Sequence, residues 1–163
     1  MHLIFTLLLL AAPPQRAAPA PDSLLVDVAG RIVVLRSSDF AALPHDTVRA
    51  SFHGGPTLTY SGVPLVSLLR LAGVPIDSLH GPQLIRRLVV EAADGYRALF
   101  SLVELAPGLG DRVVIVADRL DGHVLPASEG PWRLLVPGDG EHARWVRQVT
   151  ALRILDEGPS PGR

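Results

Sequence analysis

Hydrophobic positions repeat with a helical period most clearly in one place, and this pattern predicts a helix over residues 64–72. Apolar residues recur there at intervals of three and four, which gives the helix one apolar face: Leu65, Leu68, Leu69 and Ala72. Pro64 suits the first turn, where its missing N–H is not needed. Gly73 stands where helices often end in a left-handed residue, and Pro75 prevents continuation. The sequence therefore predicts both the helix and its ends.

Elsewhere, short apolar runs alternate with turn residues, which is typical of β-strands. Three pairs of runs predict hairpins: residues 24–28 with 31–35, 48–53 with 57–60, and 84–92 with 96–100, the last around Asp94-Gly95. Single strands are expected at residues 113–116, 131–136 and 149–155, short helical turns at 39–43 and 102–105, and a tight turn at Asp121-Gly122. The pattern predicts an α+β domain, a β-rich mixed sheet or barrel-like arrangement with few short helices.

Composition narrows the range of functions. The 163 residues carry a net charge of −1, which gives no electrostatic case for binding nucleic acid. The chain has no cysteine, and this excludes disulfides, iron–sulfur clusters and zinc–thiolate sites. Its histidines show no zinc-binding spacing, so we expect no zinc. Asp118, Asp121 and Glu129 are near in sequence and are candidates for acid–base chemistry, although turn and surface roles are the alternative.

The first residues predict export. Residues 3–12 form an apolar run of signal-peptide length, too short to span a bilayer, and Ala18–Ala20 offers an A-x-A pattern. We expect a signal peptide over residues 1–20, a folded domain over 23–155 and a disordered tail over 156–163. The mature protein is then periplasmic or secreted and has no integral membrane span.

A glycine-rich turn at residues 137–140 precedes two arginines, Arg144 and Arg147, which flank Trp145. In a helical turn, a spacing of three would place both guanidiniums on one face. Guanidiniums suit bidentate contacts to phosphate or carboxylate, and an indole offers a stacking surface. Three interpretations stay open at this point: an anion-binding edge, a solvated face beside a core tryptophan, and a docking surface for another protein.

Four segments, taken in order, carry a family resemblance: TYSGVPLVSLLRLAGV (59–74), ADGYRALFSLVEL (93–105), VIVADRLDGHVLPASEGPWRLLVPGD (114–139) and ARWVRQVTALRI (143–154). Together they resemble the molybdopterin-binding domain of the sulfite oxidase superfamily in a small, single-domain exported form. The resemblance covers residues 23–155 and implies a mixed α+β fold rich in strands.

The resemblance also implies a site. Family enzymes hold molybdenum through the dithiolene of the pterin cofactor and one cysteine thiolate. The corresponding region here, residues 48–65, contains no cysteine, and Phe52, His53 or Gly54 lies nearest the ligand position. Arg144 and Arg147 match positions that hold the pterin and its phosphate in the family, and Arg133 is expected to stabilise the fold. The implied cofactor-binding residues are His53, Gly54, Gly138, Gly140, Arg144, Trp145 and Arg147.

These observations lead to an expected function with two alternatives. The protein is expected to bind molybdopterin, another pterin or a small anionic ligand, and the missing thiolate ligand leaves open whether it catalyses a reaction. The first alternative is an active molybdopterin-dependent oxidoreductase with non-cysteine ligation, for which His53 is a candidate nitrogen donor. The second is a periplasmic accessory protein that presents Trp132 and Trp145 to a protein partner.

Overall fold

Ten strands and a few short helices form the domain in a computed structural model, which describes residues 22–52 and 55–156. The strands are β1 (Ser23–Val28), β2 (Arg31–Arg36), β3 (Asp46–Ala50), β4 (Leu58–Pro64), β5 (Arg87–Ala92), β6 (Arg97–Ser101), β7 (Ile115–Leu120), β8 (His123–Val124), β9 (Arg133–Leu135) and β10 (Val149–Leu155). The helices are α1 (Ser37–Ala41), α2 (Leu65–Leu71) and α3 (Leu102–Leu105), with 3₁₀ turns η1 (Gly81–Ile85) and η2 (His142–Arg144).

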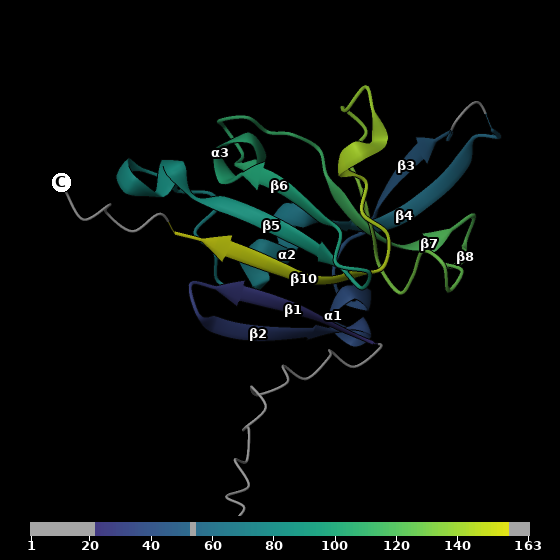
Figure 1. Cartoon of the computed structure of the whole chain (residues 1–163), viewed down its shortest axis with the longest axis horizontal. Helices are drawn as coiled ribbons and strands as arrows, with labels where there is room; N and C mark the ends of the chain where they lie inside the picture. Colours follow the sequence, from purple (N-terminus) through teal and green to yellow (C-terminus); the bar gives the residue numbers. More distant parts are fainter. Residues whose placement is uncertain (1–21, 53–54, 157–163) are drawn as a thin grey trace, which may run out of the picture.

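The strands form two sheets between which the chain passes repeatedly. The first sheet has the order β2-β1-β10-β5-β6 and is mixed, because β1 and β10 run parallel while the other neighbours are antiparallel. The second has the order β3-β4-β7-β8, with β9 also paired to β7, and is antiparallel. In Figure 1, the first sheet occupies the left and centre of the view and the second sheet the right, and α2 lies behind the first sheet. The expected strand-rich α+β class is confirmed, but the sheets do not close into a barrel.

Helix α2 shows how the sequence pattern builds the core. Leu65, Leu68 and Leu69 have no exposed surface, and full burial of such a side chain stabilises the fold by about 1.5–3 kcal/mol. Pro64 precedes the helix as its N-cap, and Gly73 has φ +80°, as expected for the left-handed residue that ends a helix. Both ends of the predicted helix are therefore confirmed to within a residue.

Gly62 lies where β4 approaches β7 too closely for any side chain. A Cβ atom at this position would lie 2.3 Å from the Cα atom of Ala117. The register of the two strands shifts between Ser61 and Gly62, which marks an irregularity in the pairing at the same point. Gly62, the first residue of the G-V-P-L sequence, thus lets β4 lie close to β7 just before α2 begins.

The predicted hairpins are present, with shifted ends. Strand β5 begins at Arg87 rather than residue 84, because residues Gly81–Ile85 form a 3₁₀ turn with a proline near its start. The run expected to extend to residue 53 ends as a strand at Ala50. The short helical turns expected at 39–43 and 102–105 are α1 and α3.

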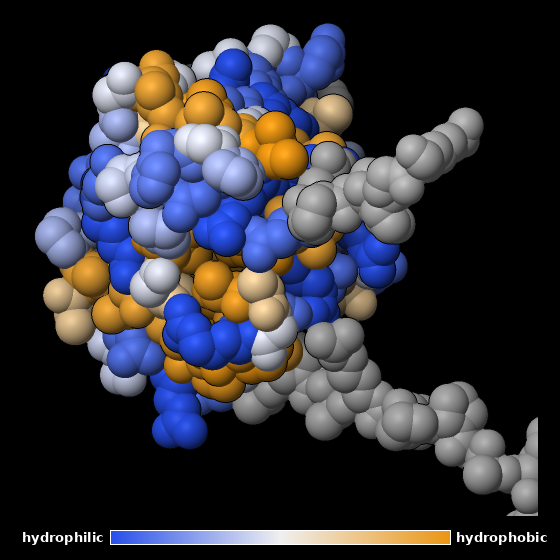
Figure 2. Space-filling view, turned by 90° about the vertical axis from the view of Figure 1, so that its left-hand side faces the viewer, coloured by the Kyte–Doolittle hydropathy of each residue, from blue (hydrophilic) through white to orange (hydrophobic). Residues whose placement is uncertain are grey.

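The surface mixes hydrophobic and hydrophilic side chains. On the face shown in Figure 2, hydrophobic side chains occur in several groups among hydrophilic ones. Over residues 22–52 and 55–156, the structure contains no helix that is long and apolar enough to cross a membrane.

Candidate functional site

The residues assigned to one ligand site lie in two separate hollows. Gly138 lines an open hollow of about 700 Å³ together with Arg49 and Arg112. Trp145 and Arg147 line a second cavity of about 170 Å³, and the two hollows share no lining residue. The glycine turn and the Trp145–Arg147 segment therefore face different spaces.

The other predicted residues add little to either hollow. No atom lies within 4 Å of the position that a Cβ of Gly140 would take. His53 and Gly54 lie outside the described residues. The cofactor-binding role of all these residues stays a prediction.

The arginine pair is not arranged as the spacing suggested. The 3₁₀ turn η2 ends at Arg144, and the next residue, Trp145, has an extended backbone with φ −86° and ψ 99°. Arg147 thus lies beyond the helical turn, so the argument from helical spacing does not hold. The two guanidiniums must be considered one at a time.

Arg144 is bound to two carboxylates of the protein itself. Its Nε and Nη2 atoms donate to the two oxygens of Asp139 at 2.8 and 2.7 Å, a bidentate pair. Its Nη1 atom donates to both oxygens of Glu104 at 3.2 Å. The guanidinium also lies 4.5 Å from the centroid of the Phe100 ring, at a distance typical of cation–π contact. The carboxylate of Asp139 thus binds the guanidinium of Arg144, which was expected to bind an anion from outside the protein.

Arg112 completes a network of four charges with Arg144, Asp139 and Glu104. Its Nη1 atom donates to Asp139 at 2.8 Å, and its Nε atom lies 3.3 Å from Glu104. Two guanidiniums and two carboxylates balance, so the network has no net charge. Hydrogen bonds from Arg144, with attraction to Arg144 and Arg112, hold the pKa of Asp139 below its ordinary value of 3.8. The same contacts raise the pKa of Arg144.

An aromatic cluster occupies the position nearest the family's metal ligand. Phe52, the one described residue of the three candidates, lies 4.9 Å from His142 and 5.2 Å from Trp145, measured between ring centroids. It meets Tyr60 edge-on at 6.1 Å, and the guanidinium carbon of Arg133 lies 4.3 Å from the centre of the Phe52 ring. At one of the three candidate positions, an aromatic side chain therefore packs into a cation–aromatic cluster and offers no sulfur donor.

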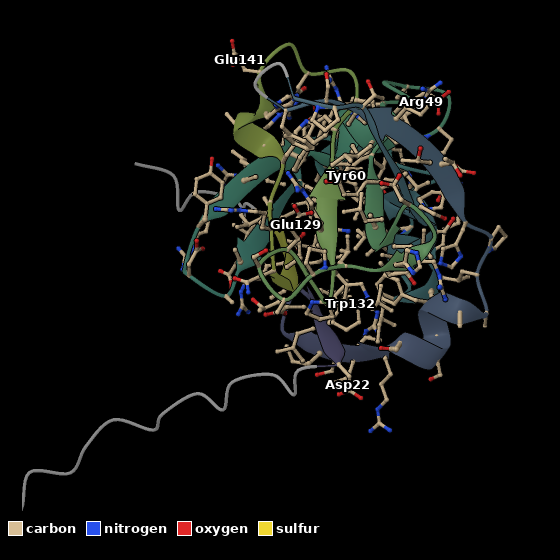
Figure 3. The ribbon with its side chains drawn as sticks, turned by 90° about the vertical axis from the view of Figure 1, so that its right-hand side faces the viewer. Asp22, Arg49, Tyr60, Glu129, Trp132 and Glu141 are labelled. Atoms are coloured by element: carbon tan, nitrogen blue, oxygen red, sulfur yellow. The ribbon has the colours of Figure 1, made fainter. Side chains whose placement is uncertain are left out.

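Arg133 is held in place under this cluster by two polar groups. Its Nη1 atom lies 2.6 Å from Glu129 and donates to the Tyr60 hydroxyl at 3.2 Å. Burial raises the pKa of Tyr60, so the hydroxyl keeps its proton and donates to Glu129 at 3.3 Å. Tyr60 and Glu129 lie beside one another near the centre of Figure 3. The structure thus places Arg133, 6% exposed, in the structural role expected from the resemblance.

The smaller cavity combines aromatic walls with one free cation. Tyr96, His142 and Trp145 line it, together with Asp94 and Arg147. Within the described part of the chain, Arg147 makes no hydrogen bond or ion pair. A planar, uncharged ring with an acidic substituent is the chemistry that such walls and such a cation would bind.

The two tryptophans are core residues. Trp132 is 2% exposed and stacks on Phe40 at a centroid distance of 5.0 Å. Trp145 is 9% exposed, and its indole N–H donates to the carbonyl of Val136. The prediction that these side chains are presented to a protein partner is wrong, because neither has the exposed surface it requires.

Several residues of these hollows were missed by the sequence analysis. Glu104 lies 40 positions from Arg144, and no local pattern links two residues so far apart. Asp94 and Tyr96 were used only as turn and strand residues of a hairpin. Asp139 stands five residues before Arg144, and an acidic residue in the turn was the one available sign that the arginine is neutralised internally.

The charge network predicts a pH-dependent loss of stability in Asp139→Asn. At pH 7 we expect the variant to be less stable than the parent by about 1–3 kcal/mol, the usual value for charge-assisted hydrogen bonds. Because the pKa of Asp139 is lowered by folding, its contribution is present above pH 3.8 and is lost as the pH falls below that value. Denaturant unfolding at pH 7 and pH 3 measures both effects.

A matched control is Asp77→Asn, which removes the exposed partner of Arg70. The side chains of that pair are 43% and 53% exposed, so the expected loss is under about 1 kcal/mol. Equal losses in the two variants, or a loss in Asp139→Asn that is unchanged at pH 3, would contradict the role given to the network.

Comparison with known proteins agrees with the resemblance found in the sequence. The profile of the family described as the oxidoreductase molybdopterin binding domain matches residues 31–162. Among solved structures, the chain is similar to the sulfane dehydrogenase SoxCD from Paracoccus pantotrophus, at 24% sequence identity and a TM-score of 0.62. The match covers 83% of this chain but 38% of that one, and no curated protein matches. The family expected from the sequence is confirmed: the chain belongs to the oxidoreductase molybdopterin-binding domains.

Proposed function

We propose that this chain is a ligand-binding member of the family that assembles no molybdenum redox centre. The observation that carries the proposal is the packing of Phe52 against Arg133, His142 and Trp145. Soft thiolate is the ligand type suited to such a metal, and a phenyl ring offers no donor atom. Phe52, one of the three residues expected nearest the metal ligand, is thus packed against other side chains.

The donor set of the chain does not fit the metal-bearing cofactor. The sequence has no cysteine. Within residues 22–52 and 55–156, no three His, Cys, Asp or Glu side chains lie together as a metal site requires. Arg144, which the resemblance assigns to the cofactor, is bound to Asp139 and Glu104. An oxidoreductase with non-cysteine ligation would have to rely on His53 alone, so we rank it second.

The cavity at Arg147 supports binding of a heteroaromatic ring that bears an acidic group. Aromatic walls from Tyr96 and Trp145 suit a flat ring, and the carboxylate of Asp94 can accept hydrogen bonds from ring N–H groups. Arg147 offers a guanidinium that has no hydrogen bond or ion pair within the described residues. Its volume of about 170 Å³ is below the range of about 300–1,000 Å³ usual for complete ligand pockets. The cavity would therefore hold the ring while the remainder of the ligand lies in solvent. A pterin with a carboxylate has this chemistry.

Export belongs to the same proposal. The apolar run at residues 3–12 and the A-x-A pattern at Ala18–Ala20 support removal of a leader before the protein reaches the periplasm or the exterior. A periplasmic protein partner is compatible with this location, although Trp132 and Trp145 would not be its contacts.

The absence of a metal centre predicts a metal-free protein from a molybdenum-replete host. Elemental analysis of the purified mature protein should find molybdenum far below one atom per chain, because no thiolate is present to anchor it. Native mass spectrometry of the same sample shows whether residues 1–20 are missing from the chain. A folded preparation with about one molybdenum per chain would contradict the proposal, and an intact N-terminus would contradict export.

Ligand binding is tested with pterin-6-carboxylate as the probe and Arg147→Gln as the variant. Loss of a charge-assisted hydrogen bond should weaken binding by about tenfold or more, measured by titration of the pterin fluorescence. The control is Arg119→Gln, since Arg119 is also exposed and has no hydrogen bond or ion pair within the described residues. Equal affinity in both variants, or no binding by the parent at millimolar probe, would show that the cavity is not the site.

A further inference from the structure

Among the described residues, the larger hollow is lined by two arginines, Arg49 and Arg112, and by no carboxylate. Its walls come from three distant segments: Thr47, Val48 and Arg49 on β3, Gly110, Arg112 and Val113 before β7, and Pro137 and Gly138 after β9. At about 700 Å³ it falls within the volume range of small-molecule sites. The geometry points to a second binding site here, for a small molecule that carries a phosphate group beside an apolar part.

Arg49 supplies the charge that such a ligand needs. It is exposed on β3, an edge strand, and makes no hydrogen bond or ion pair within the described residues. Figure 3 shows its position near the rim of the molecule, away from the Tyr60–Glu129 pair. Since no acidic side chain lines the hollow, the charge of Arg49 is not cancelled there.

Arg112 supplies a second guanidinium whose direction is already fixed. Its Nη1 and Nε atoms are bound to Asp139 and Glu104, while Nη2 has no partner in the described part of the chain. A guanidinium held by other groups loses little side-chain entropy when it binds a ligand, which favours affinity. The Cβ that Gly138 lacks would lie 3.4 Å from Nη1 of Arg112, an ordinary van der Waals distance, so the guanidinium lies against the turn.

The other residues that line the hollow determine which phosphate compounds would bind best. Val48, Val113 and Pro137 are apolar, and Val113 is 60% exposed. A bare phosphate ion would leave this surface in water, whereas a phosphate with an attached ring or alkyl group would cover it. Planar guanidiniums match the oxygens of a phosphate in a bidentate manner, and Arg49 adds a positive charge that the internal network does not balance.

This site is independent of the function proposed above. The lining of the hollow includes none of the residues around Arg147, so either site can fail without the other. Of the residues assigned from the sequence, only Gly138 contributes to it, and as a backbone wall.

The test uses phenyl phosphate as the probe and the mature full-length protein. In ¹H–¹⁵N NMR titrations, we expect the amides of Gly110, Gly138 and Val113 to shift, and inorganic phosphate to bind several-fold more weakly. Arg49→Gln should weaken binding of phenyl phosphate by about tenfold, and Arg49→Lys by less, because lysine keeps the charge but loses the fork. Both variants should fold, since Arg49 is exposed and forms no contact that stabilises the described fold.

Arg119→Gln is the matched control, because it removes another exposed, unpaired arginine from the same sheet without touching the hollow. It should bind phenyl phosphate as the parent does. The inference is overturned if Arg49→Gln binds as tightly as Arg119→Gln, if the shifted amides lie elsewhere, or if the parent shows no shift at millimolar probe.

Discussion

The network of Arg112, Arg144, Asp139 and Glu104 determines which guanidiniums near the two hollows can bind an external anion. It ties α3, the segment before β7, the turn after β9 and the end of η2 to one another. In these contacts, all three guanidinium nitrogens of Arg144 bind carboxylate oxygens, whereas only Nη1 and Nε of Arg112 do so. As a result, the smaller cavity depends on Arg147, and the larger one depends on Arg49 and the free edge of Arg112. The same four charges balance one another, so the network adds stability, and an external anion can reach only the outer edge of Arg112.

The packing around Phe52 explains how a family domain can persist without its metal ligand. The core consists of buried aliphatic and aromatic side chains from both sheets and α2, and none of these contacts needs a cofactor. Near the expected ligand position, the Phe52 ring meets three other aromatic side chains and the guanidinium of Arg133, which Glu129 and Tyr60 hold from the other side. Aromatic and cation–π contacts of this kind order the region around Phe52 without the help of a ligand.

The sequence predicted those features that depend on neighbouring residues. The period of three and four around Leu68, the Gly73 stop and the Asp94-Gly95 turn each act within a few positions, and each is present. The family could be recognised because several such segments follow one another in a fixed order. The strand-rich class was therefore predictable, while closure into a barrel depends on how sheets pack and was not.

The features that the sequence did not predict depend on partners far along the chain. Arg144 was assigned to a ligand from its type and spacing, but its partner Glu104 lies on another helix. The sequence alone does not decide whether Trp145 faces solvent or packs against Phe52, because both arrangements are compatible with the same residues. Arg49 attracted no attention because an isolated arginine on a strand has no motif; its importance follows from the absence of carboxylates around it in space.

The most direct test of this account is a double-mutant cycle between Asp139 and Arg144. Unfolding free energies of the parent, Asp139→Asn, Arg144→Gln and the double variant at pH 7 give the coupling between the two side chains. The account predicts a coupling of about 1–3 kcal/mol at pH 7 that is smaller at pH 3, because the contribution of Asp139 is lost as the pH falls below 3.8. A coupling below about 0.3 kcal/mol at pH 7 would contradict it, because Arg144 would then be free to bind another anion.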